Sequence, residues 1–339
     1  MTHARRHLLE KLQVETATLA GLALAWLVLW PAVRPVDPEG AMSFLPGGHY
    51  ARLVVFALCV WGLAAGCSVL TLSSRFEGSL LASLAATAAF SARSNPMQNL
   101  LWSWTGQYGR LYGLLAGECL AMLGILLVMV GVVVLVRQVA WFLWPQWAWK
   151  DPLAEVEHVP VTDPSKRTTY VVGFGAVIYE IGRKLFFGSQ KYGARLSRNS
   201  LTTAGACLLL EMALALVMLV MTFRSGFFRG QVIFALAASF LVGTLVAHQI
   251  FPARFSLPCW LAPLLLATVV FLLGTLVPAQ QPGPAWLYSM VLDGKGQLPL
   301  RGALPVDWFA AGTGGAMLGF WLSGRIHEAR QAEKQEKTE

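Results

Sequence analysis

Three ionisable side chains lie in long apolar stretches of this sequence, where such groups are uncommon. Glu211 and Glu118 each lie inside one stretch, and His248 lies near the end of a third. An ionised carboxylate in hydrocarbon costs about 2.5 to 3.5 kcal/mol or more, so such a group is protonated, paired or exposed to a cavity. Chains of Glu and His carry protons in pumps and transporters. The three residues are therefore candidates for proton transfer.

Each candidate also has a structural interpretation. A protonated glutamate can form a hydrogen bond across a helix interface, which would explain Glu211 without chemistry. Glu118 can meet Arg110 or interfacial water, and His248 can be an ordinary histidine at the membrane surface. If Glu211 and His248 face one another, the two form a proton-relay pair.

The composition sets the class of protein that must position these residues. Hydrophobic residues are 56% of the 339 residues and charged residues 13%, and the mean hydropathy is +0.57. A soluble protein has roughly 25% charged residues, because its surface faces water. This composition excludes a soluble enzyme, a disordered chain and a disulfide scaffold, and it predicts an integral membrane protein.

Apolar stretches of roughly 20 residues mark the predicted membrane spans, because a helix of that length crosses the hydrocarbon core. Seven stretches meet this requirement within tolerance: residues 16–33, 53–74, 111–136, 201–223, 230–250, 258–278 and 305–323. An eighth, residues 78–92, is short and rich in Ala and Ser. Alone it could be a re-entrant or interfacial helix, but counting it as a span places both chain ends and the long polar segment on one side.

The distribution of basic residues supports eight membrane spans. With eight spans, most of the 26 Lys and Arg residues fall on the side of the two chain ends, as the positive-inside rule requires. We therefore expect an all-α polytopic membrane protein with about eight transmembrane helices and both ends in the cytoplasm. The net charge of +8 then follows from topology, and no nucleic-acid partner is expected.

The predicted organisation has two membrane halves joined by a polar linker. Its parts are a cytoplasmic tail (1–15), a four-span half (16–136), a cytoplasmic linker (137–200), a second four-span half (201–323) and a charged tail (324–339). The linker contains an apolar segment too short to span, which favours an interfacial helix. A basic set near its end is expected to bind anionic lipid headgroups or to set topology alone: Arg183, Lys184, Lys191, Arg195 and Arg198.

Small residues and cysteines complete the pattern. Gly312, Gly315 and Gly319 lie in the last stretch, and Gly315 with Gly319 forms GxxxG, which favours close helix packing. A glycine-lined substrate path is the alternative. The five cysteines form no CxxC or Cys/His cluster, and the chain has no HExxH and no P-loop, so no metal or cofactor is expected.

Three function classes fit these observations. The first is a transport or permease-type component that uses buried carboxylates. The second is a non-catalytic subunit or assembly factor of a larger membrane complex. The third is a membrane-embedded enzyme acting on a lipid-linked substrate, which rests only on polar residues such as His158, Glu180 and His248. Besides the lipid bilayer, a separate ATPase docking on the linker is a candidate partner, and a bacterial inner membrane is the expected location.

Overall fold

The computed structural model describes residues 3–74, 76–104, 107–143, 198–222, 228–252, 256–276 and 302–336. All regular structure in these residues is helical. The elements are α1 (His3–Ala23), η1 (Leu24–Leu29), α2 (Trp30–Val33), α3 (Tyr50–Leu70), α4 (Phe76–Arg93), α5 (Met97–Ser103), α6 (Tyr108–Leu143), α9 (Arg198–Thr222), α10 (Arg229–Ile250), α11 (Leu257–Leu276), α13 (Pro305–Asp307), η4 (Trp308–Gly312) and α14 (Thr313–Glu336). The segments η1 and η4 are π-helical turns in the first and last long helices.

Six of the described helices are long and apolar enough to cross a membrane. They are Leu8–Val33, Tyr50–Leu70, Tyr108–Ala140, Thr202–Thr222, Arg229–Ile250 and Leu257–Leu276. Each overlaps one of the apolar stretches predicted from the sequence. The prediction of a helical integral membrane protein is confirmed at this level.

The other two predicted spans, 78–92 and 305–323, are helical but less apolar. Both helices lie inside the bundle, where α4 packs against α1, α3, α6 and α14, and α14 packs against α10 and α11. The buried residues of α4 include Gly78, Ser79, Ser83, Thr87 and Ser91. Small and hydroxyl side chains suit contact between helices better than contact with lipid. Their low hydropathy therefore reflects an interior position.

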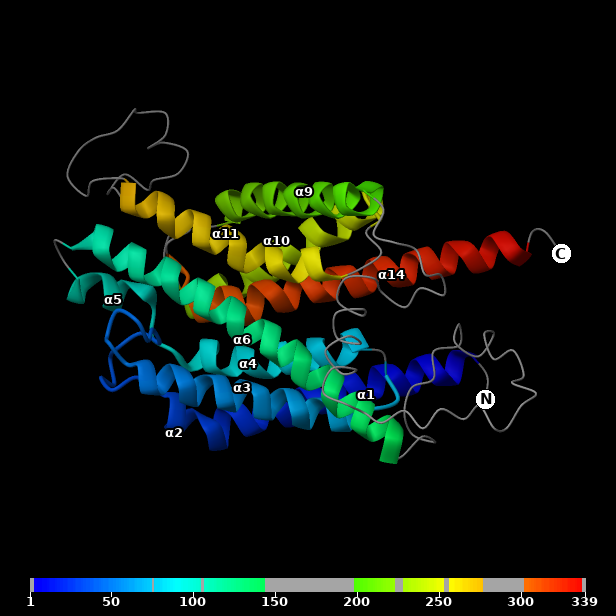
Figure 1. Ribbon diagram of the computed structural model, residues 1–339, viewed down its shortest axis with the longest axis horizontal. Helices are drawn as coiled ribbons and strands as arrows, with labels where there is room; N and C mark the ends of the chain where they lie inside the picture. The colour runs from blue at the N-terminus through cyan, green and yellow to red at the C-terminus, as the bar shows by residue number, and fades with distance from the viewer. Residues whose placement is uncertain are drawn as a thin grey trace.

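The two halves of the chain form one bundle. Contacts of α6 with α11, and of α14 with α4, join residues 3–143 to residues 198–336. In Figure 1, α14 runs between the helices of the first half and α10, and both chain ends lie at the same end of the bundle. We call this the terminal end. The opposite end carries residues 34–49 and α5, and we call it the loop end.

Helices continue past several predicted boundaries. The first helix begins at His3, α6 continues to Leu143, and α14 continues to Glu336. A helix does not end where its apolar composition ends, because polar side chains at its tip can face water or find partners. The predicted interfacial helix of the linker lies outside the described residues.

Candidate functional site

Glu211 lies on α9 at the interface with α10, and its side chain is completely buried. The hydroxyl of Thr244 donates to Oε1 of Glu211 at 2.6 Å. In the described part of the chain, Oε2 has no hydrogen-bond partner. The thiols of Cys207 and Cys259 lie beside this carboxyl group.

A glycine allows α9 and α10 to approach this closely. A Cβ atom at Gly243 would lie 3.2 Å from the carbonyl oxygen of Glu211 and 3.3 Å from the amide nitrogen of Ala215. Both distances are shorter than ordinary van der Waals contact, so a larger residue would separate the helices. The short hydrogen bond between Thr244 and Glu211 depends on this contact.

A second group of polar side chains lies at the terminal end, between α10 and α14. Nδ1 of His248 and Nε2 of Gln249 each lie 2.7 Å from the hydroxyl oxygen of Ser323. The ring of His327 lies 5.6 Å from that of His248, centre to centre. Nε2 of His327 is buried and has no partner among the described residues.

These two groups follow one another along α10. Thr244 and His248 are four residues apart, which is one turn, or about 6 Å along the helix axis. Glu211, Thr244, His248, Ser323 and His327 therefore form a series of titratable and hydroxyl side chains leading toward the terminal end, which we call the polar series. Glu211 and His248, predicted as a relay pair, are its first and third members, with Thr244 between them.

The glycines of the last helix hold α14 against α10. A Cβ atom at Gly315 would overlap the carbonyl oxygen of Ala237, and one at Gly319 would overlap that of Leu241. A Cβ atom at Gly312 would lie 3.0 Å from the Cβ of Pro263 on α11. This close packing places Ser323 within reach of His248.

Glu118 on α6 is also completely buried, but it serves a different region. Its Oε2 accepts hydrogen bonds from the hydroxyl of Ser43 at 2.8 Å and from the amides of Phe44 at 2.9 Å and Leu45 at 3.1 Å. Arg110, the alternative partner expected from the sequence, instead lies over the ring of Trp104. Glu118 thus anchors the loop that covers the loop end of α6.

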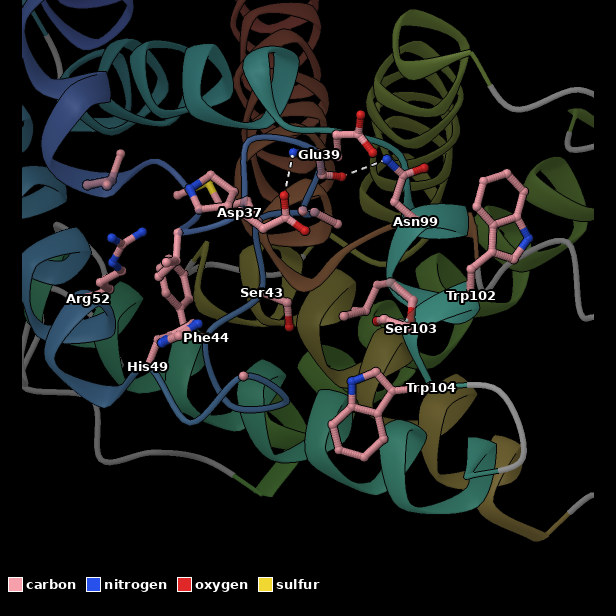
Figure 2. Close-up of a pocket in the computed structure, with 18 residues that line it drawn as sticks. Asp37, Glu39, Ser43, Phe44, His49, Arg52, Asn99, Trp102, Ser103 and Trp104 are labelled. Atoms are coloured by element: carbon pink, nitrogen blue, oxygen red, sulfur yellow. Dashed lines mark hydrogen bonds between the residues drawn. The ribbon is translucent and has the colours of Figure 1, made fainter.

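This anchored loop forms part of a cavity of about 310 Å³. The segment around residues 33–49 forms one side, and α5 with Trp104 forms the other. Figure 2 shows Arg52 and His49 on one side of this cavity and Trp102 and Trp104 on the other. Ser43, which donates to Glu118, also lines it.

A buried ion pair that the sequence analysis did not single out joins the two halves at the loop end. Asp307 accepts from both terminal nitrogens of Arg229, at 2.8 and 2.5 Å, and from the hydroxyl of Ser91 at 2.5 Å. The amide of Leu304 supplies a fourth hydrogen bond at 2.7 Å. Asp307, like Glu211, is a carboxylate within an apolar stretch of the sequence, and this feature could have identified it.

Two further basic residues form hydrogen bonds or ion pairs with other segments of the chain at the terminal end. Arg137 donates to the carbonyl oxygen of Ser74 at 2.6 Å and to the hydroxyl of Ser79 at 2.9 Å, and thereby fixes the turn between α3 and α4. Arg325 on α14 forms an ion pair with Glu10 on α1. Both interactions join distant segments of the chain.

The remaining predicted site residues are only partly described. Arg183, Lys184, Lys191 and Arg195 lie outside the described residues, and Arg198 is the first residue of α9. His158 and Glu180 also lie outside them. Within the described segments, no group of three or more His, Cys, Asp or Glu residues could hold a metal ion.

Comparison with protein-family models, with curated proteins and with solved structures found no match.

Proposed function

We propose that this protein is a transport protein of the permease type, in which Glu211 accepts and releases a proton through the polar series. The observation that carries the proposal is this series of titratable and hydroxyl groups, which follow one another from Glu211 to His327. Ser and Thr hydroxyls both donate and accept, and histidine changes its charge near neutral pH. Such groups, placed one after another in space, can pass a proton from one to the next.

The environment of Glu211 supports the gain and loss of a proton. A proton carrier must be stable enough in both charge states, and burial without counter-charge disfavours the ionised form. Glu211 has one hydroxyl donor, Thr244, and one carboxyl oxygen without a partner in the described residues. A proton on that oxygen removes the charge, and its loss restores it.

The proposal includes a topology of eight spans. We infer that α4 and the helix formed by α13, η4 and α14 cross the membrane inside the bundle, together with the six apolar helices. The terminal end then faces the cytoplasm, as the distribution of Lys and Arg indicates. A bacterial inner membrane fits these features, and the polar series leads toward the cytoplasmic side.

Proton-coupled flux in liposomes tests this function. The purified protein is reconstituted with the pH indicator pyranine inside, a pH gradient is imposed, and amino acids, peptides, sugars, organic acids and organic cations are added in turn. We expect one solute class to change the internal pH in wild-type vesicles. The change should be absent with Glu211→Gln and retained with Val269→Ala, a control at an exposed position of α11. Unchanged flux in Glu211→Gln would exclude Glu211 as the proton carrier.

A subunit of a larger membrane complex is the second candidate. Among the six apolar spans, α9 is less buried than all but the first, and it exposes Leu209, Val217 and Met221 at 57% to 69%. A partner helix could cover this face. Purification from native membranes in mild detergent, followed by mass spectrometry, distinguishes the two: a stoichiometric membrane partner supports the subunit, and a protein that purifies alone supports the permease.

A further inference from the structure

The cavity at the loop end is fixed in shape by side chains from α5, from the turn between α4 and α5, and from α6. Asn99 on α5 donates to the carbonyl oxygen of Glu39 at 2.6 Å, and Asn95 donates to that of Pro38 at 2.8 Å. The hydroxyl of Ser94 accepts from the amide of Met42 at 2.8 Å. Together with the bonds of Glu118, these contacts hold the loop before any ligand arrives. A preformed site loses little entropy on binding.

Charged groups of both signs line this cavity and retain binding capacity. Arg52 donates one terminal N–H to the carbonyl oxygen of Arg34, and its other terminal nitrogen has no partner among the described residues. The carboxylate of Glu39 likewise has none there. Asp37 uses one oxygen, Oδ1, to accept from the amide of Glu39 at 3.0 Å. One side of the cavity can therefore bind an anion, and a second can bind a cation.

The groups that can bind an anion and those that can bind a cation lie on different sides of the cavity. Figure 2 shows Arg52 and His49 together on one side, with Asp37 and Glu39 along another. Trp102 and Trp104 close the side away from Arg52. A ligand that satisfies all of these groups carries an anionic group and a cationic group in one small molecule.

The position of the cavity identifies the anionic group. Trp102 is 74% exposed, and tryptophans of this kind concentrate at the level of lipid headgroups. Phosphate is the common anion at that level, and the fork of an arginine binds phosphate oxygens in pairs. Carboxylates suit a primary ammonium group, because it donates three hydrogen bonds, whereas a quaternary ammonium donates none.

We propose that this cavity is a binding site for a phosphate linked to a primary ammonium group, as in the phosphoethanolamine headgroup. Arg52 and His49 bind the phosphate, and Asp37 and Glu39 bind the ammonium. The volume of about 310 Å³ is at the small end of ligand sites, so it admits a headgroup and leaves acyl chains in the bilayer. The site lies at the opposite end from His248, and its test does not depend on proton transport.

Binding is measured on the full chain with two probes. In the first arm, native mass spectrometry counts lipid retained by the protein in detergent with added phosphatidylethanolamine, phosphatidylcholine or phosphatidylglycerol. In the second arm, calorimetry measures binding of soluble O-phosphoethanolamine. Retention of phosphatidylethanolamine alone assigns the site to the lipid, whereas tight binding of the soluble compound assigns it to a free metabolite. Both results support the proposed chemistry.

Variants locate the binding to this cavity. Arg52→Gln should lower affinity for the retained probe by about tenfold or more, because a charge-assisted hydrogen bond is lost. Arg34→Gln is the matched control, since it removes an exposed arginine that does not line the cavity. Its affinity should stay within about twofold of wild type.

A third variant still tests the proposal if Arg52→Gln disturbs folding. Glu39→Gln changes an exposed carboxylate and should reduce the preference for phosphatidylethanolamine over phosphatidylcholine, while the melting temperature stays unchanged. Equal retention of the three lipids without binding of O-phosphoethanolamine would overturn the proposal. So would a Glu39→Gln protein that retains the full preference.

Discussion

Glu118 and Glu211 are both fully buried glutamates in apolar helices, yet the structure surrounds them differently. Glu118 accepts three hydrogen bonds on one oxygen, all from residues 43–45. Glu211 accepts one from a hydroxyl, that of Thr244 on a neighbouring helix, and has the Cys259 thiol beside it. Three donors, two of them backbone amides, fix the Glu118 carboxyl group in place, whereas one hydroxyl and a weakly donating thiol constrain that of Glu211 less. The number of donors, rather than burial, separates an anchor from a candidate proton carrier.

The largest effect is expected from removing the anchor. Glu118→Ala should lower the free energy of unfolding by about 3 to 5 kcal/mol, because two backbone amides and the Ser43 hydroxyl lose their acceptor. Thermal unfolding in detergent and the rate of proteolysis in residues 34–49 measure this loss. Glu118→Gln retains an acceptor oxygen and should lose less. A Glu118→Ala protein as stable as wild type would show that the loop does not depend on this carboxylate.

A smaller effect is expected where α14 meets α10. Gly315→Val should cost about 1 to 3 kcal/mol, because its side chain would overlap the backbone at Ala237. The displaced helix would also separate Ser323 from His248. Gly324→Ala is the control, since a Cβ atom there has no neighbour within 4 Å. Equal melting temperatures for the two variants would contradict the close packing.

Thr244→Val tests the hydroxyl donor of Glu211. The side chain keeps its shape but loses the hydroxyl, so the free energy of unfolding should fall by about 1 kcal/mol. Proton-coupled flux should fall as well, because Thr244 lies between Glu211 and His248. Thermal unfolding and the pyranine assay measure the two effects. Val269→Ala, at an exposed position of α11, should change neither greatly.

The smallest change in stability is expected from Glu211→Gln. The amide oxygen can still accept from Thr244, and no charge needs to be buried, so the change should stay within about 1 kcal/mol. Loss of flux with unchanged melting temperature would sharpen the contrast with Glu118. If Glu211→Gln destabilised the protein as much as Glu118→Ala, Glu211 would be a structural residue too.

Hydropathy predicted the lipid-facing helices but described the interior ones poorly. The six apolar spans were recognisable because lipid contact requires a long run of apolar residues. Helix α4 buries Ser and Ala against other helices, and such surfaces carry no comparable signal. The prediction of residues 78–92 therefore depended on charge and parity, and the structure adds that this segment is a helix at the centre of the bundle.

The candidate residues were visible in the sequence, whereas their partners were not. Glu211, Glu118 and His248 stood out as ionisable groups in apolar surroundings. Their partners come from distant segments: Ser43 lies 75 residues from Glu118, and Thr244 lies 33 residues from Glu211. Local patterns carry no information about such pairs, because they arise only when the helices pack.

The ion pair between Glu10 and Arg325 has a consequence for biosynthesis. The two residues are separated by 315 positions, and a ribosome adds about 5 to 20 residues per second. The first helix is therefore made roughly 15 to 60 seconds before the arginine that binds it. During that interval α1 can pack against α3 and α4, but its ion pair with α14 must wait for the last helix. A chain that stops before α14 would therefore lack this link between its first and last helices.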